Sequence, residues 1–366
     1  MYKIYQITLL LMVGLCLGRV SATEQPFGDY QIRVLADNLS FPWAVTQLPD
    51  ERLLVSEKGG RLVLLSADGA VTPVGGVPEV FAKGQGGLMD VVLHPDYIKN
   101  GWIYLSFAQG DEQANHLQVV RARLDNERLV QVEPLFTATP DKATPVHYGA
   151  RMAFLGDQSL VIASGDGFDY REQAQNPANH LGKLVRFKDD GSLPADNPSF
   201  HQGLAGLYTL GHRNPQGLAW DPVREQLFAN EHGPAGGDEI NLIQAGANYG
   251  WPVTTLGKDY SGANISPYKT YPGMQPPLVD WTPSIAPSAL VIYRGAMFRE
   301  LEGDLLSTTL KSKEVRRVIL SGLQVVRQES LFTELESRLR DIHIGNRGQI
   351  YLLTDSAQGQ LLVVER

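Results

Sequence analysis

The chain has 366 residues, of which 43% are hydrophobic, and a formal net charge of −8 at neutral pH. This acidic balance argues against nucleic acid or an anionic membrane as the partner. With 37 glycines and 22 prolines, turns are frequent and long helices are not expected. No Ser/Gly-rich or Pro-rich linker divides the sequence, so we expect one domain over residues 23–366.

The first 22 residues have the features of a secretory signal peptide. Lys3 gives a basic start, an apolar run follows over 7–18, and VSA at 20–22 is a small-residue cleavage pattern. The apolar run is short for a bilayer span, although a retained membrane anchor is the alternative. Cleavage after residue 22 removes Cys16, the only cysteine, and leaves 30 basic against 40 acidic residues. We therefore expect a periplasmic protein with no disulfide and no membrane span after cleavage.

A loose internal repeat runs through the rest of the chain. Each copy has an apolar segment, a turn with Pro, Asp or Gly, and a second β-rich run. The six pairs of segments are 43–45 and 53–57, 89–96 and 102–106, 151–157 and 160–163, 217–222 and 226–229, 289–293 and 304–306, and 341–345 and 350–353. Intervals of roughly 45 to 70 residues match a four-stranded propeller blade with its loops. The sequence predicts an all-β, six-bladed β-propeller with four-stranded antiparallel blades; a non-repetitive β-sandwich or pair of barrels is the alternative.

Two further features follow from the repeat. Residues 30–35 alternate like a strand, and we expect them to pair with the last blade and close the ring. Polar turns precede four of the copies: QGG at 85–87, HYG at 147–149, RNPQ at 213–216 and RLR at 338–340. If the blades are equivalent, these turns converge at one mouth of the central channel.

Four polar, glycine-rich segments carry a resemblance to a known family. GHRNPQGL at 211–218 combines a planar guanidinium with two amides, which suits a loop that binds a flat polar ligand. HYGAR at 147–151 lies upstream, and EHGPAGGDEIN at 231–241 and NYGWP at 248–252 follow. From about residue 41 to the C-terminus, the chain resembles the soluble quinoprotein glucose/sorbosone dehydrogenases, which use pyrroloquinoline quinone (PQQ) and calcium. The resemblance independently implies a six-bladed propeller.

His147 is the candidate general base, because an imidazole titrates near neutrality. Its HxGxR setting matches the family's catalytic histidine segment, although Ala150 stands where the family has a second glycine. That change is tolerable unless the position needs a positive φ. The resemblance implies that Asp166 orients and charges His147, with a plain turn aspartate as the alternative. It also implies that Arg213 stabilises negative charge on the reduced cofactor.

The resemblance further implies the cofactor and metal contacts. The side chains that match PQQ contacts are Gln85, Arg213, Asn214, Tyr260, Lys311, Arg338 and Arg340. Because PQQ has three carboxylates, a cluster of cations is chemically required; for each cation alone, a solvated surface charge is the alternative. The groups that match calcium ligands are the Gly233 and Pro234 carbonyls at the cofactor's ion, and Asp238, Glu239 and the Tyr249 carbonyl at a second, structural ion. An exposed acidic turn is the alternative for the second site. Zinc at Glu231-His232 lacks further nitrogen or sulfur ligands at suitable spacing.

We therefore expect an exported quinoprotein that oxidises aldose sugars at C1 to lactones, with hydride passing to PQQ and the hydroxyl proton to His147. The sequence leaves the electron acceptor open among a cytochrome, a quinone and a dye. One alternative is a calcium-dependent propeller lactonase, which would need a carboxylate cage in the channel. The other is a non-catalytic propeller that binds glycan or protein. Trp281 either stacks on a sugar or belongs to the core.

Overall fold

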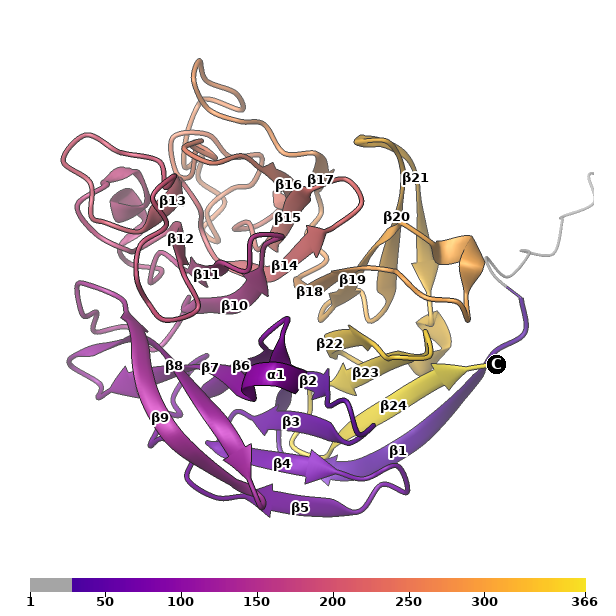
Figure 1. Cartoon of the computed structure of the whole chain (residues 1–366). Coiled ribbons are helices and arrows are strands. Elements are labelled where there is room, and N and C mark those ends of the chain that lie inside the picture. The colour runs from indigo at the N-terminus through magenta and orange to yellow at the C-terminus, as the bar shows by residue number, and fades with distance from the viewer. Residues whose placement is uncertain (1–27) are drawn as a thin grey trace, which may run out of the picture.

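The computed structural model describes residues 28–366, so the predicted signal peptide lies outside the described residues. In this part of the chain, 24 strands form six four-stranded antiparallel sheets. The sheets stand around a central axis as the blades of a propeller (Figure 1). The predicted six-bladed β-propeller is therefore confirmed. No helix within 28–366 is long and apolar enough to cross a membrane.

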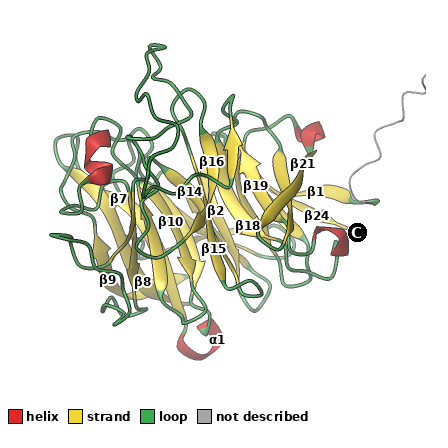
Figure 2. Cartoon of the chain, turned by 90° about the horizontal axis from the view of Figure 1, so that it is seen from above, coloured by secondary structure: helices red, strands yellow, loops and turns green. Residues whose placement is uncertain are grey.

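Each blade is a meander of four strands. Blades 1 to 3 comprise β2 (Pro42–Gln47), β3 (Leu53–Glu57), β4 (Arg61–Leu65) and β5 (Val71–Val74); β6 (Leu88–Leu93), β7 (Trp102–Gly110), β8 (Asn115–Asp125) and β9 (Arg128–Thr137); and β10 (Gly149–Phe154), β11 (Leu160–Ser164), β12 (Lys183–Phe187) and β13 (Leu207–Leu210). Blades 4 to 6 comprise β14 (Pro215–Asp221), β15 (Gln226–Glu231), β16 (Asp238–Ile243) and β17 (Val279–Trp281); β18 (Pro287–Ile292), β19 (Leu305–Thr309), β20 (Val315–Ser321) and β21 (Gln324–Leu331); and β22 (Leu339–Ile344), β23 (Ile350–Thr354), β24 (Gly359–Glu365) and β1 (Gln31–Leu39). The helical turns are α1 (Tyr97–Asn100), η1 (Arg171–Gln175), η2 (Arg299–Leu301) and η3 (Thr333–Leu335); Figure 2 shows α1 at one edge of the molecule.

The repeat is confirmed strand by strand, since each predicted copy gives the first two strands of one blade. Those strands read as continuous apolar runs because both faces are covered by neighbouring blades; β2 and β3 are buried at every residue. Outer strands such as β5 and β21 are mostly exposed. The core is accordingly a set of apolar layers between blades.

The ring is closed by the first strand of the chain, as expected. β1 pairs antiparallel with β24, with Gln31 opposite Glu365. In Figure 1 the indigo β1 lies beside the yellow β24. This pairing covers the edge that β24 would otherwise expose.

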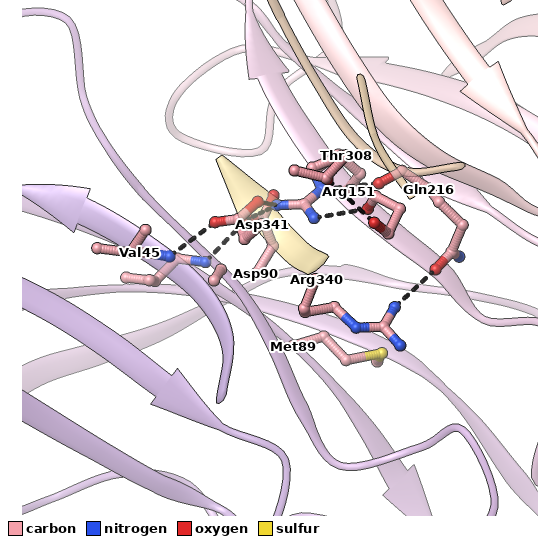
Figure 3. A network of polar contacts seen from close by, with 12 residues as sticks. Val45, Met89, Asp90, Arg151, Gln216, Thr308, Arg340 and Asp341 are labelled. Atoms are coloured by element: carbon pink, nitrogen blue, oxygen red, sulfur yellow. Dashed lines mark hydrogen bonds and ion pairs between the residues drawn. The ribbon is translucent and has the colours of Figure 1, made fainter. Parts of the chain in front are cut away.

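A buried polar network ties the innermost strands together at the axis (Figure 3). The Arg151 guanidinium on β10 forms ion pairs with Asp90 on β6 at 3.1 Å and with Asp341 on β22 at 3.0 Å. It also donates to the carbonyls of Gln216 on β14 and Ser288 on β18. Asp341 in turn accepts the backbone N–H of Val45 on β2. One guanidinium and two carboxylates thus connect the inner strands of all six blades.

Candidate functional site

The site lies at one end of the propeller axis, because successive strands of each blade run in opposite directions. The start of a blade's first strand and the end of its second strand are at the same end of the blade. Gln85 and Asn214 precede first strands, and Lys58 and Asp355 follow second strands. All four residues line one cavity. The expectation that turns from separate blades share one mouth is therefore confirmed.

The cavity has a volume of about 370 Å³, which is within the usual range for small-molecule sites. Its wall mixes cations, amides and flat rings. The lining residues include Phe41, Trp43, Lys58, Gln85, Tyr148, Asn214, Gln216, His232, Arg338, Arg340 and Asp355. Trp43 also lies over Arg151 of the axial network, 4.3 Å from ring centroid to Cζ, so the network supports this part of the wall.

His147 and Asp166 form a buried pair beside the cavity. Nδ1 of His147 is 2.7 Å from Oδ1 of Asp166, and the two residues are 4% and 0% exposed. The other carboxylate oxygen accepts Trp251 Nε1–H at 2.8 Å, and Gln85 Oε1 accepts the backbone N–H of His147. A carboxylate at Nδ1 selects the tautomer with its proton there, which leaves Nε2 as the proton acceptor. Burial lowers the pKa of His147, and Asp166 opposes that shift.

The backbone that carries His147 is strained. His147, Gly149 and Ala150 have φ values of 52°, 68° and 76°, in the left-handed region. Ala150 therefore occupies a position that does need a positive φ, at a cost of about 1 kcal/mol relative to glycine. The tight turn places His147 against the loop after β11, where its ring packs edge-on to Phe168 at 5.1 Å.

Arg213 and Asn214 hold this region together. The Arg213 guanidinium donates to the Gly233 carbonyl at 2.7 Å and to the His232 carbonyl at 3.2 Å. Its backbone N–H donates to Glu231 Oε2 at 2.7 Å. Asn214 Oδ1 accepts the N–H of Gly149, two residues after His147, and Asn214 lines the cavity. Arg213 thus links the loop before β14 to the loop after β15.

The cavity's cations suit a polyanionic ligand. Arg338 forms two hydrogen bonds to Asp355 Oδ2, at 2.9 and 2.7 Å. Arg340 has a long ion pair of 3.4 Å to Asp355, and its buried Nε has no partner. Lys58 donates to the Gly84 carbonyl, and burial lowers the pKa of its ammonium. Three cations therefore face one carboxylate, and the unpartnered Nε fits an anionic ligand such as a tricarboxylate.

Two predicted contacts lie apart from this cavity. The side chain of Lys311 is exposed, and only its neighbour Leu310 lines the wall. Tyr260 is 66% exposed and lines a second hollow of about 300 Å³ with Phe168, Arg213 and Pro234. Trp281 belongs to the core between blades, where its Nε1–H donates to Gln328.

Neighbouring strands β15 and β16 carry a cluster suited to a hard cation. Asn241 Nδ2 donates to both Glu231 and Glu239, while its buried Oδ1 has no partner. Burial and the nearby Glu231 charge raise the pKa of Glu239 well above its ordinary value. Glu231, Glu239 and Tyr249 line one small hollow. Glu231 is also 2.8 Å from His212 Nδ1 and accepts the Arg213 backbone N–H, so Glu239 and the unpartnered amide oxygen are the groups that best fit calcium, which takes oxygen ligands.

The other predicted metal ligands have partners within the protein. Asp238 accepts the backbone N–H groups of Gly233, Ile285 and Ala286. The Gly233 carbonyl accepts Arg213, and the Pro234 carbonyl accepts Ser284 Oγ at 3.4 Å. Within residues 28–366, no three His, Cys, Asp or Glu side chains form a metal-binding group. A metal here would depend on amide and backbone oxygens.

The sequence interpretation missed Lys58, His232 and Asp355 as parts of the wall. Each directly follows the second strand of a blade, and Asp166 lies two residues after the second strand of blade 3. His232 is held by its Nε2 at 2.7 Å from the Pro287 carbonyl, and burial lowers its pKa to about 3. The repeat therefore carried a usable signal: in blades 1, 4, 5 and 6 the cavity is lined by the residue that follows the second strand, namely Lys58, His232, Leu310 and Asp355.

Fold and site define a propeller with a cation-lined cavity and a buried histidine–aspartate pair. The model of the glucose/sorbosone dehydrogenase family matches residues 39–363, and the chain belongs to that family. It is 38% identical to the aldose sugar dehydrogenase YliI of Escherichia coli over 342 residues, which cover 91% of this chain and 92% of that protein.

Two solved structures of aldose sugar dehydrogenases have the same fold as this chain. The apo-form of the soluble aldose sugar dehydrogenase from Escherichia coli has a TM-score of 0.89 at 37% identity, covering 92% of this chain and 99% of the other. The PQQ-bound form of an aldose sugar dehydrogenase from Streptomyces coelicolor has a TM-score of 0.76 at 28% identity, with coverage of 92% and 99%.

Proposed function

We propose that this protein is a PQQ- and calcium-dependent dehydrogenase that oxidises aldose sugars at C1 to lactones. The observation that carries the proposal is the His147–Asp166 pair, buried beside a cavity lined by three cations, of which Arg340 keeps a buried Nε without a partner. The family match and the PQQ-bound relative support the choice of cofactor. The lactonase alternative loses support, because the one carboxylate that lines the cavity is already paired with Arg338 and Arg340.

In this proposal each residue acts at a stated atom. Nε2 of His147 takes the proton from the anomeric hydroxyl while the C1 hydrogen leaves as hydride. PQQ, when bound, supplies the electrophilic carbon that accepts the hydride. Asp166 holds the imidazole in the competent tautomer and stabilises the imidazolium. Arg340, Arg338 and Lys58 would hold the cofactor's carboxylates, and Arg213 would stabilise negative charge on the reduced cofactor.

For calcium, we propose a second, structural site formed by Glu239, Glu231, the side-chain oxygen of Asn241 and the carbonyl of Tyr249. A divalent cation there would relieve the repulsion between the two carboxylates and engage the unpartnered amide oxygen. Asp238 would organise the loop through its three backbone donors. The carbonyls of Gly233 and Pro234 are proposed at the cofactor's ion, where Gly233 would have to exchange its hydrogen bond from Arg213.

We further propose export to the periplasm and cleavage after residue 22. The apolar run over 7–18 and the VSA pattern support this step. N-terminal sequencing of protein recovered from the periplasmic fraction tests it, and a chain that keeps Met1 would contradict it.

The function is tested by reconstitution. PQQ and calcium are added to the apoprotein with glucose or other aldoses, and reduction of a dye and the quinone spectrum are followed. We expect His147→Ala to bind PQQ but to lose about 10²- to 10⁴-fold in rate. Wild-type turnover by that variant would refute the role of His147 as the base. Failure of the wild-type protein to bind PQQ would refute its assignment as a quinoprotein.

A further inference from the structure

Lys142 is a buried cation near the proposed base that the proposed chemistry does not use. It is 3% exposed, and its backbone exchanges two hydrogen bonds of 2.9 Å with Asn115. Its ammonium donates to Asn115 Oδ1 at 3.0 Å and to the Thr144 carbonyl. Both acceptors are neutral, and no carboxylate within residues 28–366 forms an ion pair with it. A buried ammonium without a counter-ion is costly, so its position calls for a reason.

The position of Lys142 connects the cavity wall with the carboxylate of the base. Nζ lies 3.5 Å from the ring centroid of Tyr148, and Tyr148 lines the cavity. The hydroxyl of Tyr148 donates to the same Asn115 oxygen, at 2.5 Å. Along its stem, Lys142 packs against Gly167: a Cβ on that glycine would be 2.8 Å from Lys142 Cδ. Gly167 directly follows Asp166.

A second buried lysine lies near the same carboxylate. Lys183 is 0% exposed and opens β12, where it pairs with Ser164, two residues before Asp166. Its ammonium donates to the carbonyls of Gln173 and Leu181, which are again neutral. Burial lowers the pKa of Lys142 and of Lys183 to about 7, and Asp166 opposes the shift in both. Asp166 is therefore the negative charge that both ammonium groups share.

We propose that Lys142 is a positioning residue for the His147–Asp166 pair: its buried ammonium, when charged, disfavours a positive charge on the imidazole. His147 then remains a neutral proton acceptor. In a dry environment one unit charge acts over several ångströms, so a neighbour that does not touch the imidazole still sets its charge. This inference rests on the proposed role of His147 as the base.

The direction of the effect follows from the groups around His147. Its pKa is lowered by burial, raised by Asp166, and lowered again by Arg213 and Lys142. His232 lies close enough to interact with it, and Tyr148 and Lys183 are the other titratable groups of this region. Removing the charge of Lys142 takes away one of the lowering effects. The pKa of His147 then rises, and the base stays protonated up to a higher pH.

The test measures His147 directly in the full chain without PQQ. Imidazole C–H signals are followed by NMR against pH, and the His147 signal is assigned by its loss in His147→Ala. Lys142→Met removes both charge and hydrogen bonds, whereas Lys142→Gln keeps a donor for Asn115. Lys83→Met, at a side chain that is 60% exposed, is the matched control.

We expect both Lys142 variants to raise the pKa of His147, because one lowering charge is removed, and Lys83→Met to leave it unchanged. In reconstituted enzyme, the acid limb of kcat/KM should move by the same amount. An unchanged His147 titration in folded Lys142→Gln overturns the inference; if Lys142→Met fails to fold, the glutamine variant decides alone. A shifted titration without sugar-dependent turnover of the wild type would reject the dehydrogenase while leaving the electrostatic effect intact.

Discussion

Two arginines on the inner strands show how differently one side chain is used along the same axis. Arg151 has two carboxylates, two carbonyls and an aromatic face as partners. Arg340 has one long hydrogen bond of 3.5 Å, one ion pair of 3.4 Å and a buried Nε with no partner. Figure 3 shows both guanidinium groups in the same region. A saturated buried charge holds the fold together, whereas an underpartnered one is ready for a ligand.

The largest predicted effect is the loss of stability when Arg151, the fully partnered arginine, is replaced. Arg151→Met leaves Asp90 and Asp341 buried without a counter-charge, and we expect the free energy of unfolding to fall by about 3–5 kcal/mol. Denaturant unfolding followed by circular dichroism measures it. Loss of less than about 1 kcal/mol would show that the network does not hold the six blades together.

Replacing Arg340, the arginine with few partners, should weaken ligand binding and not stability. Arg340→Met removes a charge that the apoprotein leaves incompletely paired, so stability should hold or rise. PQQ affinity should fall by about 30-fold or more, since truncating one partner of a buried charge pair costs 2–5 kcal/mol. Equilibrium titration of the apoprotein with PQQ tests this, with Arg327→Met, on an exposed side chain, as control. Unchanged affinity would remove Arg340 from the cofactor site.

A comparison of Lys58 with Lys311 tests two sources of the cofactor assignment, because the cavity geometry indicates Lys58 and the family resemblance indicates Lys311. Lys58 lines the cavity, and Lys311 is exposed outside it. We expect Lys58→Met to weaken PQQ binding about tenfold, from one lost charge-assisted hydrogen bond. Lys311→Met should change it about twofold, because solvent screens an exposed charge. The reverse ranking in the same titration would support the Lys311 contact that the resemblance implies.

The smallest effect is a pH dependence of the axial network. Burial raises the pKa of Asp341 to about 6, above the value near 3.8 of an exposed aspartate. Between these values the folded state binds more protons than the unfolded state, so this group's contribution to stability falls as pH rises from about 4 to 6. The difference between wild type and Asp341→Asn, measured by denaturation across that range, isolates it. Parallel pH profiles for the two proteins would contradict the shift.

Much of the fold was predictable from local pattern. Apolar segments such as 53–57 and 350–353 recur because each blade must bury its inner strands on both faces. The same repeat predicted that Gln85, Asn214 and Arg338 would meet, since equivalent loops end at the same mouth. Pairing of the first strand with the last blade was likewise foreseeable, because β24 would otherwise be an open edge.

Tertiary structure alone decided which charges are satisfied. Asp238 and Glu239 are adjacent in sequence, yet the first is fully bonded to backbone amides and the second faces another carboxylate. Lys142 and Lys311 look alike as letters, but one is buried beneath the cavity wall and the other is in solvent. The sequence by itself determined the six blades and the mouth where their loops converge. The reason is that each buried inner strand is a short run of apolar residues, which can be recognised from the local sequence alone. Partnership and dielectric environment depend on residues brought together from different blades, and only the folded chain defines them.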